Sequence, residues 1–128
     1  MLKKNTKRVG IINLGLSNLG SIINLIVFFK KKVKLIDNFS EMNNFDHIIL
    51  PGIGSFKEGA KIIKKKKLKV HLNKFINKGG RFFGICLGMQ LMFKESNEHG
   101  KAKGLGLFEG TCTQFKPKLI KVPHVGFN

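Results

Sequence analysis

One cysteine in this chain stands where a nucleophile would be exposed by a tight turn. Cys86 lies in the stretch Gly84-Ile85-Cys86-Leu87-Gly88, after an apolar segment and before residues with helical spacing. A sharp turn from a strand into a helix exposes a nucleophile, and flanking glycines let neighbouring backbone come close. A helix N-terminus behind the sulfur favours the thiolate, which attacks carbonyl carbons. The pattern predicts a cysteine nucleophile, although a cysteine taken alone is more often a buried structural residue.

A glycine-containing loop follows another apolar segment and could serve the same chemistry. Its sequence is Pro51-Gly52-Ile53-Gly54-Ser55-Phe56. Backbone N–H groups of such a loop, together with that of Leu87, can stabilise the oxyanion of a tetrahedral intermediate. The loop alone fits a plain turn between a strand and a helix equally well. Combined with Cys86, it indicates amide hydrolysis through a thioester.

The elements that must position these residues alternate between short apolar runs and longer helical segments. This alternation predicts an α/β fold with a mostly parallel open sheet, helices on both faces, and Cys86 at the carboxyl edge of a central strand. We expect strands at 8–13, 33–36, 46–50 (stopping at Pro51) and 81–85, and an antiparallel edge strand at 111–115.

Helix signals separate these strands. Asn18 is a suitable N-cap for a helix whose apolar face consists of Leu19, Ile22, Ile23, Ile26 and Phe29. Ser55 and Glu58 have capping-box spacing and predict a helix that runs into the lysine segment 64–67. Further helical faces follow at 68–76 and from Leu87 onward.

The charge of the chain is unusual: 24 lysines and arginines against 7 acidic residues give a formal net charge of +17. A field of this strength attracts nucleic acid or anionic membranes non-specifically. The lysines are spread along the chain, and arginine, the usual reader of bases and phosphates, is scarce. A solvated lysine surface is therefore favoured over a dedicated nucleic-acid-binding domain, which remains the competing interpretation.

Length and cysteine usage favour one domain in a reducing compartment. The 128 residues, 42% of them hydrophobic, suffice for one buried core. The longest strongly apolar stretch, 25–29, is far shorter than the roughly 20 residues that cross a bilayer. With only Cys86 and Cys112 present, we expect no disulfide and a cytoplasmic protein.

The two loops, and a third segment near the end, resemble a known family. Residues 84–91 (Gly-Ile-Cys-Leu-Gly-Met-Gln-Leu) resemble the nucleophile motif of class I glutamine amidotransferases, and residues 51–56 resemble the oxyanion loop of one branch. Together with 122–128 (Val-Pro-His-Val-Gly-Phe-Asn), they are similar to the amidotransferase subunits of imidazole glycerol phosphate synthases. The resemblance implies the flavodoxin-like fold of this class, of which residues 1–128 would be the N-terminal portion.

The resemblance also implies roles for individual residues. Cys86 would attack the side-chain amide of glutamine, and the ammonia would pass to a (βα)8-barrel cyclase subunit for histidine biosynthesis in a heterodimer, with no cofactor and no metal. The substrate-binding positions would be Gly52, Ile53, Gly54, Leu87, Gln90 and Glu98. The positions facing the barrel would be Asn18, Pro123, His124, Gly126, Phe127 and Asn128.

The family's catalytic histidine and glutamate belong to a His-Pro-Glu segment that we expect after Asn128. The four histidines present are His47, His71, His99 and His124, and their positions indicate surface or structural roles. Two alternatives within the resemblance remain: a paralogous subunit that supplies ammonia for sugar modification, and an inactive truncated remnant.

Overall fold

The main sheet confirms the predicted mostly parallel α/β architecture. The computed structural model describes residues 7–116 and residue 122. Four strands, β1 (Arg8–Ile12), β2 (Lys32–Ile36), β3 (His47–Gly52) and β4 (Arg81–Cys86), pair in the order β2-β1-β3-β4. All three pairings are parallel, so the carboxyl ends of the strands share one edge.

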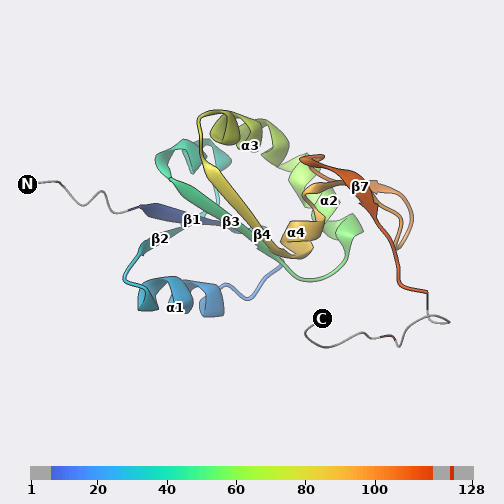
Figure 1. The fold of residues 1–128 in the computed structure, drawn as a ribbon, viewed down its shortest axis with the longest axis horizontal. Helices are drawn as coiled ribbons and strands as arrows, with labels where there is room; N and C mark the ends of the chain where they lie inside the picture. The colour runs from blue at the N-terminus through green and yellow to red at the C-terminus, as the bar shows by residue number, and fades with distance from the viewer. Residues whose placement is uncertain (1–6, 117–121, 123–128) are drawn as a thin grey trace, which may run out of the picture.

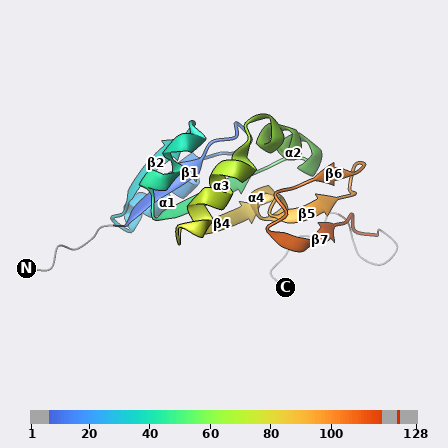
Figure 2. The same cartoon turned by 90° about the horizontal axis from the view of Figure 1, so that it is seen from above.

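Helices lie on both faces of this sheet, as predicted (Figure 1). Helix α1 (Gly20–Phe28) covers one face, and α3 (Leu68–Asn77) lies on the other, as the view from above also shows (Figure 2). The remaining helices are the 3-10 helix η1 (Phe39–Asn44), α2 (Phe56–Lys65) and the short α4 (Leu87–Gln90).

The hydrophobic core lies between the sheet and helices α2 and α3. Its central strand residues, Ile12, Ile48 and Leu50, are fully buried. They form one cluster with Leu68, Leu72 and Phe75 of α3, whereas Ile76, the fourth residue of its predicted apolar face, is exposed. Burying an aliphatic side chain of this size stabilises a fold by about 1.5–3 kcal/mol, so this side of the sheet supplies most of the stabilisation.

The helix starts follow the capping signals of the sequence. The Ser55 hydroxyl accepts a hydrogen bond from the Glu58 N–H at 3.2 Å, and α2 begins at Phe56 as predicted. The expected N-cap at Asn18 needs correction: α1 begins at Gly20, one residue later than expected, and Leu19 occupies the N-cap position. Asn18 precedes it, and its Oδ1 accepts a hydrogen bond from the Gly20 N–H at 3.2 Å. Residues 64–67 are exposed, which confirms the solvated lysine segment.

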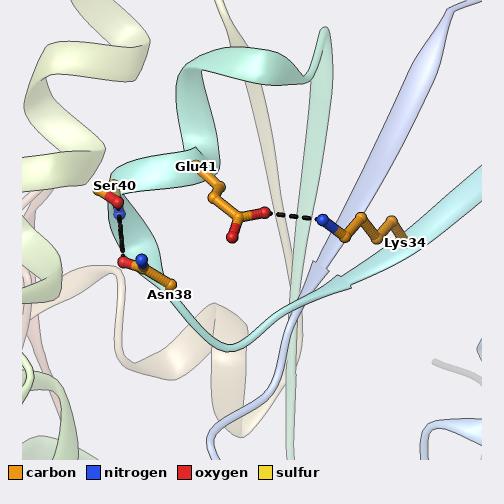
Figure 3. A network of polar contacts seen from close by, with 4 residues as sticks. All are labelled: Lys34, Asn38, Ser40 and Glu41. Atoms are coloured by element: carbon orange, nitrogen blue, oxygen red, sulfur yellow. Dashed lines mark hydrogen bonds and ion pairs between the residues drawn. The ribbon is translucent and has the colours of Figure 1, made fainter.

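A short polar network holds the connection between β2 and η1 (Figure 3). Asn38 Oδ1 accepts hydrogen bonds from both the backbone N–H and the hydroxyl of Ser40, at 3.1 and 2.8 Å. Lys34 donates to Glu41 across the same turn at 2.8 Å. This network starts η1 directly after β2 and leaves Phe39 and Met42 in the core.

Three sequence expectations about strands need correction. The strand expected at 111–115 is instead β7 (Phe108–Cys112), which belongs to a separate small sheet with β5 (Phe93–Ser96) and β6 (Ala102–Lys103). It pairs parallel with β5, not antiparallel at the edge of the main sheet. The rings of Phe93 and Phe108 pack against each other at an angle, with centroids 5.8 Å apart. Cross-strand aromatic pairs of this kind stabilise the pairing of β5 with β7, which the local sequence did not indicate.

The second correction concerns β3, which continues through Pro51 to Gly52. The pairing of β3 with β1 ends at Ile49, so β3 has no partner on that side at Pro51. Because proline has no backbone N–H, it fits such a position without the loss of a hydrogen bond to a neighbouring strand. The third concerns β4, which is the edge strand of the described sheet and not a central one.

The amino ends of three strands meet at Asp46. Its carboxylate accepts a hydrogen bond from the Arg8 N–H at 2.8 Å, while its backbone N–H donates to the Arg8 carbonyl at 3.0 Å. The Arg81 N–H in turn donates to the Asp46 carbonyl at 3.1 Å. The bond from the Arg8 backbone is the main reason that the pKa of Asp46 lies below its ordinary value, with Lys7 and Arg8 charges acting in the same direction.

We predict that Asp46→Asn lowers the free energy of unfolding at neutral pH. The ionised carboxylate is favoured in the folded state, so its contribution is present above its unfolded pKa of 3.8 and is lost as the pH falls through the lower folded pKa. The parent and the variant should therefore converge at strongly acidic pH in urea unfolding. Glu109→Gln is the control, because Glu109 is 87% exposed and its pair with Lys94 should contribute little. A difference that persists unchanged into acid would contradict the assignment.

Candidate active site

Cys86 occupies a strained turn at the junction of β4 and α4. Its backbone has φ +53° and ψ −119°, a conformation that residues with a Cβ rarely adopt, and it is exposed. Strain of this kind persists only where the surrounding structure imposes it. The turn therefore presents the thiol to solvent at the carboxyl edge of the sheet, as the nucleophile pattern predicted.

The glycines on either side of Cys86 are required by close backbone packing. A Cβ on Gly88 would lie 1.7 Å from the Leu50 carbonyl oxygen of β3, and a Cβ on Gly84 would lie 2.7 Å from the Met89 nitrogen. Gly88 thus lets the start of α4 press against β3, and Gly84 lets the same helix fold back over β4. These two contacts impose the turn that exposes the cysteine.

The predicted oxyanion loop lies directly beside this turn. Gly52, the last residue of β3, is the register partner of Cys86. A Cβ on Gly52 would lie 3.1 Å from the Leu87 Cβ and 3.3 Å from the Gly88 nitrogen. The structure therefore brings Gly52, at the start of the predicted oxyanion loop, together with Cys86 and Leu87, which are far from it in the sequence.

Backbone donors at this edge are of two kinds. The N–H groups at the start of α4, which include that of Leu87, have no acceptor within the helix. The Ile53 N–H, in contrast, donates to the Leu16 carbonyl at 2.7 Å, so in this conformation it is not the free donor that the sequence suggested. The 13–18 loop, which also carries Asn18, thus contacts the oxyanion loop, a neighbour that the sequence did not indicate.

Gln90 and Glu98 lie together on the side of the small sheet, near Cys112. The Cys112 thiol donates to the Gln90 carbonyl at 3.7 Å. Burial, and after it the charge of Glu98, raise the pKa of Cys112. Gln90 and Glu98 are both half-buried, and the Glu98 N–H donates to the Ser96 hydroxyl at 3.2 Å. Cys112 is therefore a neighbour of two predicted substrate residues, which the sequence did not reveal.

Two of the described histidines, His47 and His71, are held away from Cys86. His47 is at the amino end of β3, five register positions from Gly52 and so roughly 16 Å along the strand from the Cys86 edge. His71, on α3, packs against Phe39 of η1, the element that follows β2, with ring centroids 6.4 Å apart. His99 lies in the turn between β5 and β6. Pro123, His124, Gly126, Phe127 and Asn128 lie outside the described residues.

Comparison with known proteins agrees with this geometry. Residues 12–125 match the model of the CobB/CobQ-like glutamine amidotransferase domain. The chain belongs to the glutamine amidotransferases. Its fold resembles a crystal structure of a glutamine amidotransferase (TM-score 0.69, 19% identity, covering 82% of this chain and 55% of the other). A putative peptidase E from Listeria monocytogenes is also similar in fold (TM-score 0.65, 14% identity, covering 83% and 66%).

Curated relatives carry a more specific name. The chain is 39% identical over 120 residues to the "imidazole glycerol phosphate synthase subunit HisH" of Caldanaerobacter subterraneus, covering 94% of this chain and 59% of the relative. The subunit of the same name from Helicobacter hepaticus is 38% identical over 132 residues, covering 94% and 61%. The chain thus spans about three-fifths of the length of these relatives.

Within 7–116 and 122, no helix is long and apolar enough to cross a membrane. In the same residues, no group of three or more His, Cys, Asp and Glu side chains could hold a metal ion.

We predict that Cys86 reacts with iodoacetamide before Cys112 in the folded protein. Cys86 is exposed, whereas Cys112 is half-buried and its raised pKa lowers the thiolate fraction at neutral pH. Peptide mapping after brief labelling measures both sites. Cys112→Ser should leave the labelling rate of Cys86 unchanged, and preferential labelling of Cys112 in the parent would contradict the proposed elbow.

We also predict that Gly88→Ala strongly destabilises the fold or displaces the elbow. An added methyl group would overlap the Leu50 carbonyl, so β3 and α4 must separate, and overpacking of this kind costs about 1–3 kcal/mol or more. Gly20→Ala is the matched control, because its Cβ would meet nothing closer than 3.4 Å in a helical position. Thermal unfolding followed by circular dichroism compares the two, and equal melting temperatures would refute the packing argument.

Proposed function

We propose that this chain carries the nucleophile and oxyanion side of the glutaminase subunit of imidazole glycerol phosphate synthase, which releases ammonia from glutamine for histidine biosynthesis. The observation that carries the proposal is the pairing of Gly52 with Cys86, which sets the oxyanion loop against the exposed thiol. The names of the curated relatives support the same function.

The geometry supports a thioester mechanism. The Cys86 Sγ would attack the side-chain amide carbon of glutamine, and the amide oxygen would take up the negative charge. The Leu87 N–H lies at the foot of α4 beside Gly52 and is the first donor for that oxygen. Ammonia then leaves, and water hydrolyses the thioester to glutamate.

The Ile53 N–H can join the oxyanion hole only after a local change. Because one N–H cannot donate fully to two acceptors, its bond to the Leu16 carbonyl must break before it serves the substrate oxygen. Leu16 lies two residues before Asn18, which the resemblance places on the partner surface. Docking of a partner at Asn18 would therefore act on the loop that holds Ile53.

The reaction also needs a base and a proton donor. His47 and His71 are held away from Cys86, and we propose that the His-Pro-Glu segment of the family supplies both roles. Gln90 and Glu98 would hold the amino-acid part of glutamine from the side of the small sheet.

A cyclase partner follows from the chemistry of ammonia. Uncharged ammonia needs a route that excludes water to reach its acceptor, so a partner must cover the cleft. We propose the (βα)8-barrel cyclase subunit, docked on Asn18 and on residues 123–128, in the cytoplasm. A paralogous subunit that supplies ammonia for sugar modification would share this active site and differ in its partner.

We predict that the 128-residue chain by itself releases glutamate at least on the order of 10³-fold more slowly than a version extended through the His-Pro-Glu segment of a relative, because the proposed base belongs to that segment. Glutamate release is measured with and without the cyclase subunit. Cys86→Ser should abolish the activity of the extended version and leave its circular dichroism spectrum unchanged. Robust turnover by the 128-residue chain would overturn this catalytic set, with His124 as the first residue to test as its base.

A further inference from the structure

Ser96, at the end of β5, carries a buried hydroxyl that the thioester mechanism does not use. Ser96 is 2% exposed, and in the part of the chain that the structure describes no other polar or charged residue is buried to this extent. Its hydroxyl accepts a hydrogen bond from the Glu98 N–H at 3.2 Å. Because burial of a hydroxyl is unfavourable unless the group is hydrogen-bonded, the bond to Glu98 offsets the cost of placing this serine in the interior.

The small sheet holds Ser96 from both sides. Strand β5 is the middle strand, and Ser96 is the register partner of Ala102 on one side and of Cys112 on the other. The Asn97 N–H also donates to the Cys112 carbonyl at 3.1 Å. Ser96 is therefore fixed in position, and a hydrogen bond from the backbone two residues later to its hydroxyl sets the turn by which the chain leaves β5 and reaches Glu98.

The contacts of Cys112 show that this turn brings Glu98 to the side of Gln90. Burial raises the pKa of the Cys112 thiol, and the charge of Glu98 raises it further, so the Glu98 carboxylate lies within electrostatic reach of that thiol. The same thiol donates to the Gln90 carbonyl at 3.7 Å. Gln90 is the last residue of α4, the helix that begins directly after Cys86. The Ser96 turn thus places Glu98 near the helix that follows the nucleophile.

A second polar pair links the same two strands and provides a contrast. Glu95 and Thr111 are register partners one residue before Ser96 and Cys112, and neighbouring side chains of a strand point to opposite faces. The Thr111 hydroxyl donates to Glu95 at 3.3 Å, and Thr111 is exposed. This bond joins β5 to β7 and does not involve Glu98, so it separates a general effect of the small sheet from an effect of Ser96.

We propose that Ser96 is the positioning residue for Glu98, because its hydroxyl fixes the turn that orients the Glu98 carboxylate toward the ammonium group of glutamine. The proposal rests on the proposed function, in which Gln90 and Glu98 hold the amino-acid part of the substrate. A hydrogen bond between a carboxylate and an ammonium group is strong but depends on placement, so a displaced Glu98 binds glutamine less tightly. The turn at Cys86 depends on a different contact, that of Gly88 with Leu50, and should be unaffected.

The test measures covalent labelling of Cys86 in this chain by a chloromethyl ketone that carries the α-amino-acid group of glutamine. The Cys86 sulfur displaces chloride from this probe and forms a thioether. The dependence of the labelling rate on probe concentration gives a half-saturation concentration, which reports binding, and a maximum rate, which reports the thiol. Ser96→Ala should raise the half-saturation concentration by about 5-fold, as expected for the loss of one hydrogen bond, and leave the maximum rate unchanged.

Three comparisons make the result specific to Ser96. Thr111→Val is the matched control, because it removes a hydroxyl from the same small sheet and should leave both labelling constants unchanged. Glu98→Gln should raise the half-saturation concentration at least as much as Ser96→Ala, and Ser96→Ala should add nothing in that background, since Ser96 acts through Glu98. Labelling of Cys86 by iodoacetamide, which has no amino-acid group, should be equally fast in the parent and in Ser96→Ala.

Hydrogen exchange of the parent is a measurement that does not depend on the folding of any variant. The Glu98 amide should be protected, because its N–H donates to the buried Ser96 hydroxyl. An unprotected Glu98 amide would overturn the positioning role and leave the proposed function standing. So would equal half-saturation concentrations in the parent and Ser96→Ala, or an equal effect of Thr111→Val. Labelling of Cys86 in the parent that does not saturate with the probe would overturn the proposed function, and this inference with it.

Discussion

The close approach of α4 to the end of β3 is the contact on which the candidate site depends. Gly88 stands so near the Leu50 carbonyl that no side chain fits between them. This contact fixes where α4 begins, and the chain can then reach α4 from β4 only through the strained conformation of Cys86. Exposure of the thiol, its position beside Gly52 and the placing of Leu87 follow from one backbone contact.

The stability of the molecule is unevenly distributed around this site. The α2–α3 side of the sheet has a continuous core of aliphatic and aromatic side chains, and the lysines of that side project into solvent. The α1 side exposes apolar area instead. Because hydrophobic burial is the main favourable term in folding, the first side holds the sheet together.

The high positive charge of the chain is compatible with a fold that is stabilised mainly by its hydrophobic core. Three ion pairs link described side chains, and all of them are at least partly exposed, so they contribute little to stability. The lysines of 64–67 lie on the outside of α2 and beyond it, away from the carboxyl edge of the sheet. A solvated surface accounts for them, and the nucleic-acid interpretation gains nothing from their placement.

By itself the sequence determined the local events: the cap at Ser55, the glycine elbow around Cys86 and the alternation of strands and helices, because each depends on neighbours within a few residues. The strand β5, the parallel pairing of β7 and the passage of β3 through Pro51 were decided by partners far along the chain. The same holds for the Ile53 hydrogen bond to Leu16 and the gathering of Gln90 and Glu98 near Cys112. Backbone N–H and C=O groups, and strands that mix polar with apolar residues, pair with whichever partner the tertiary structure places beside them. The local sequence therefore does not determine these pairings.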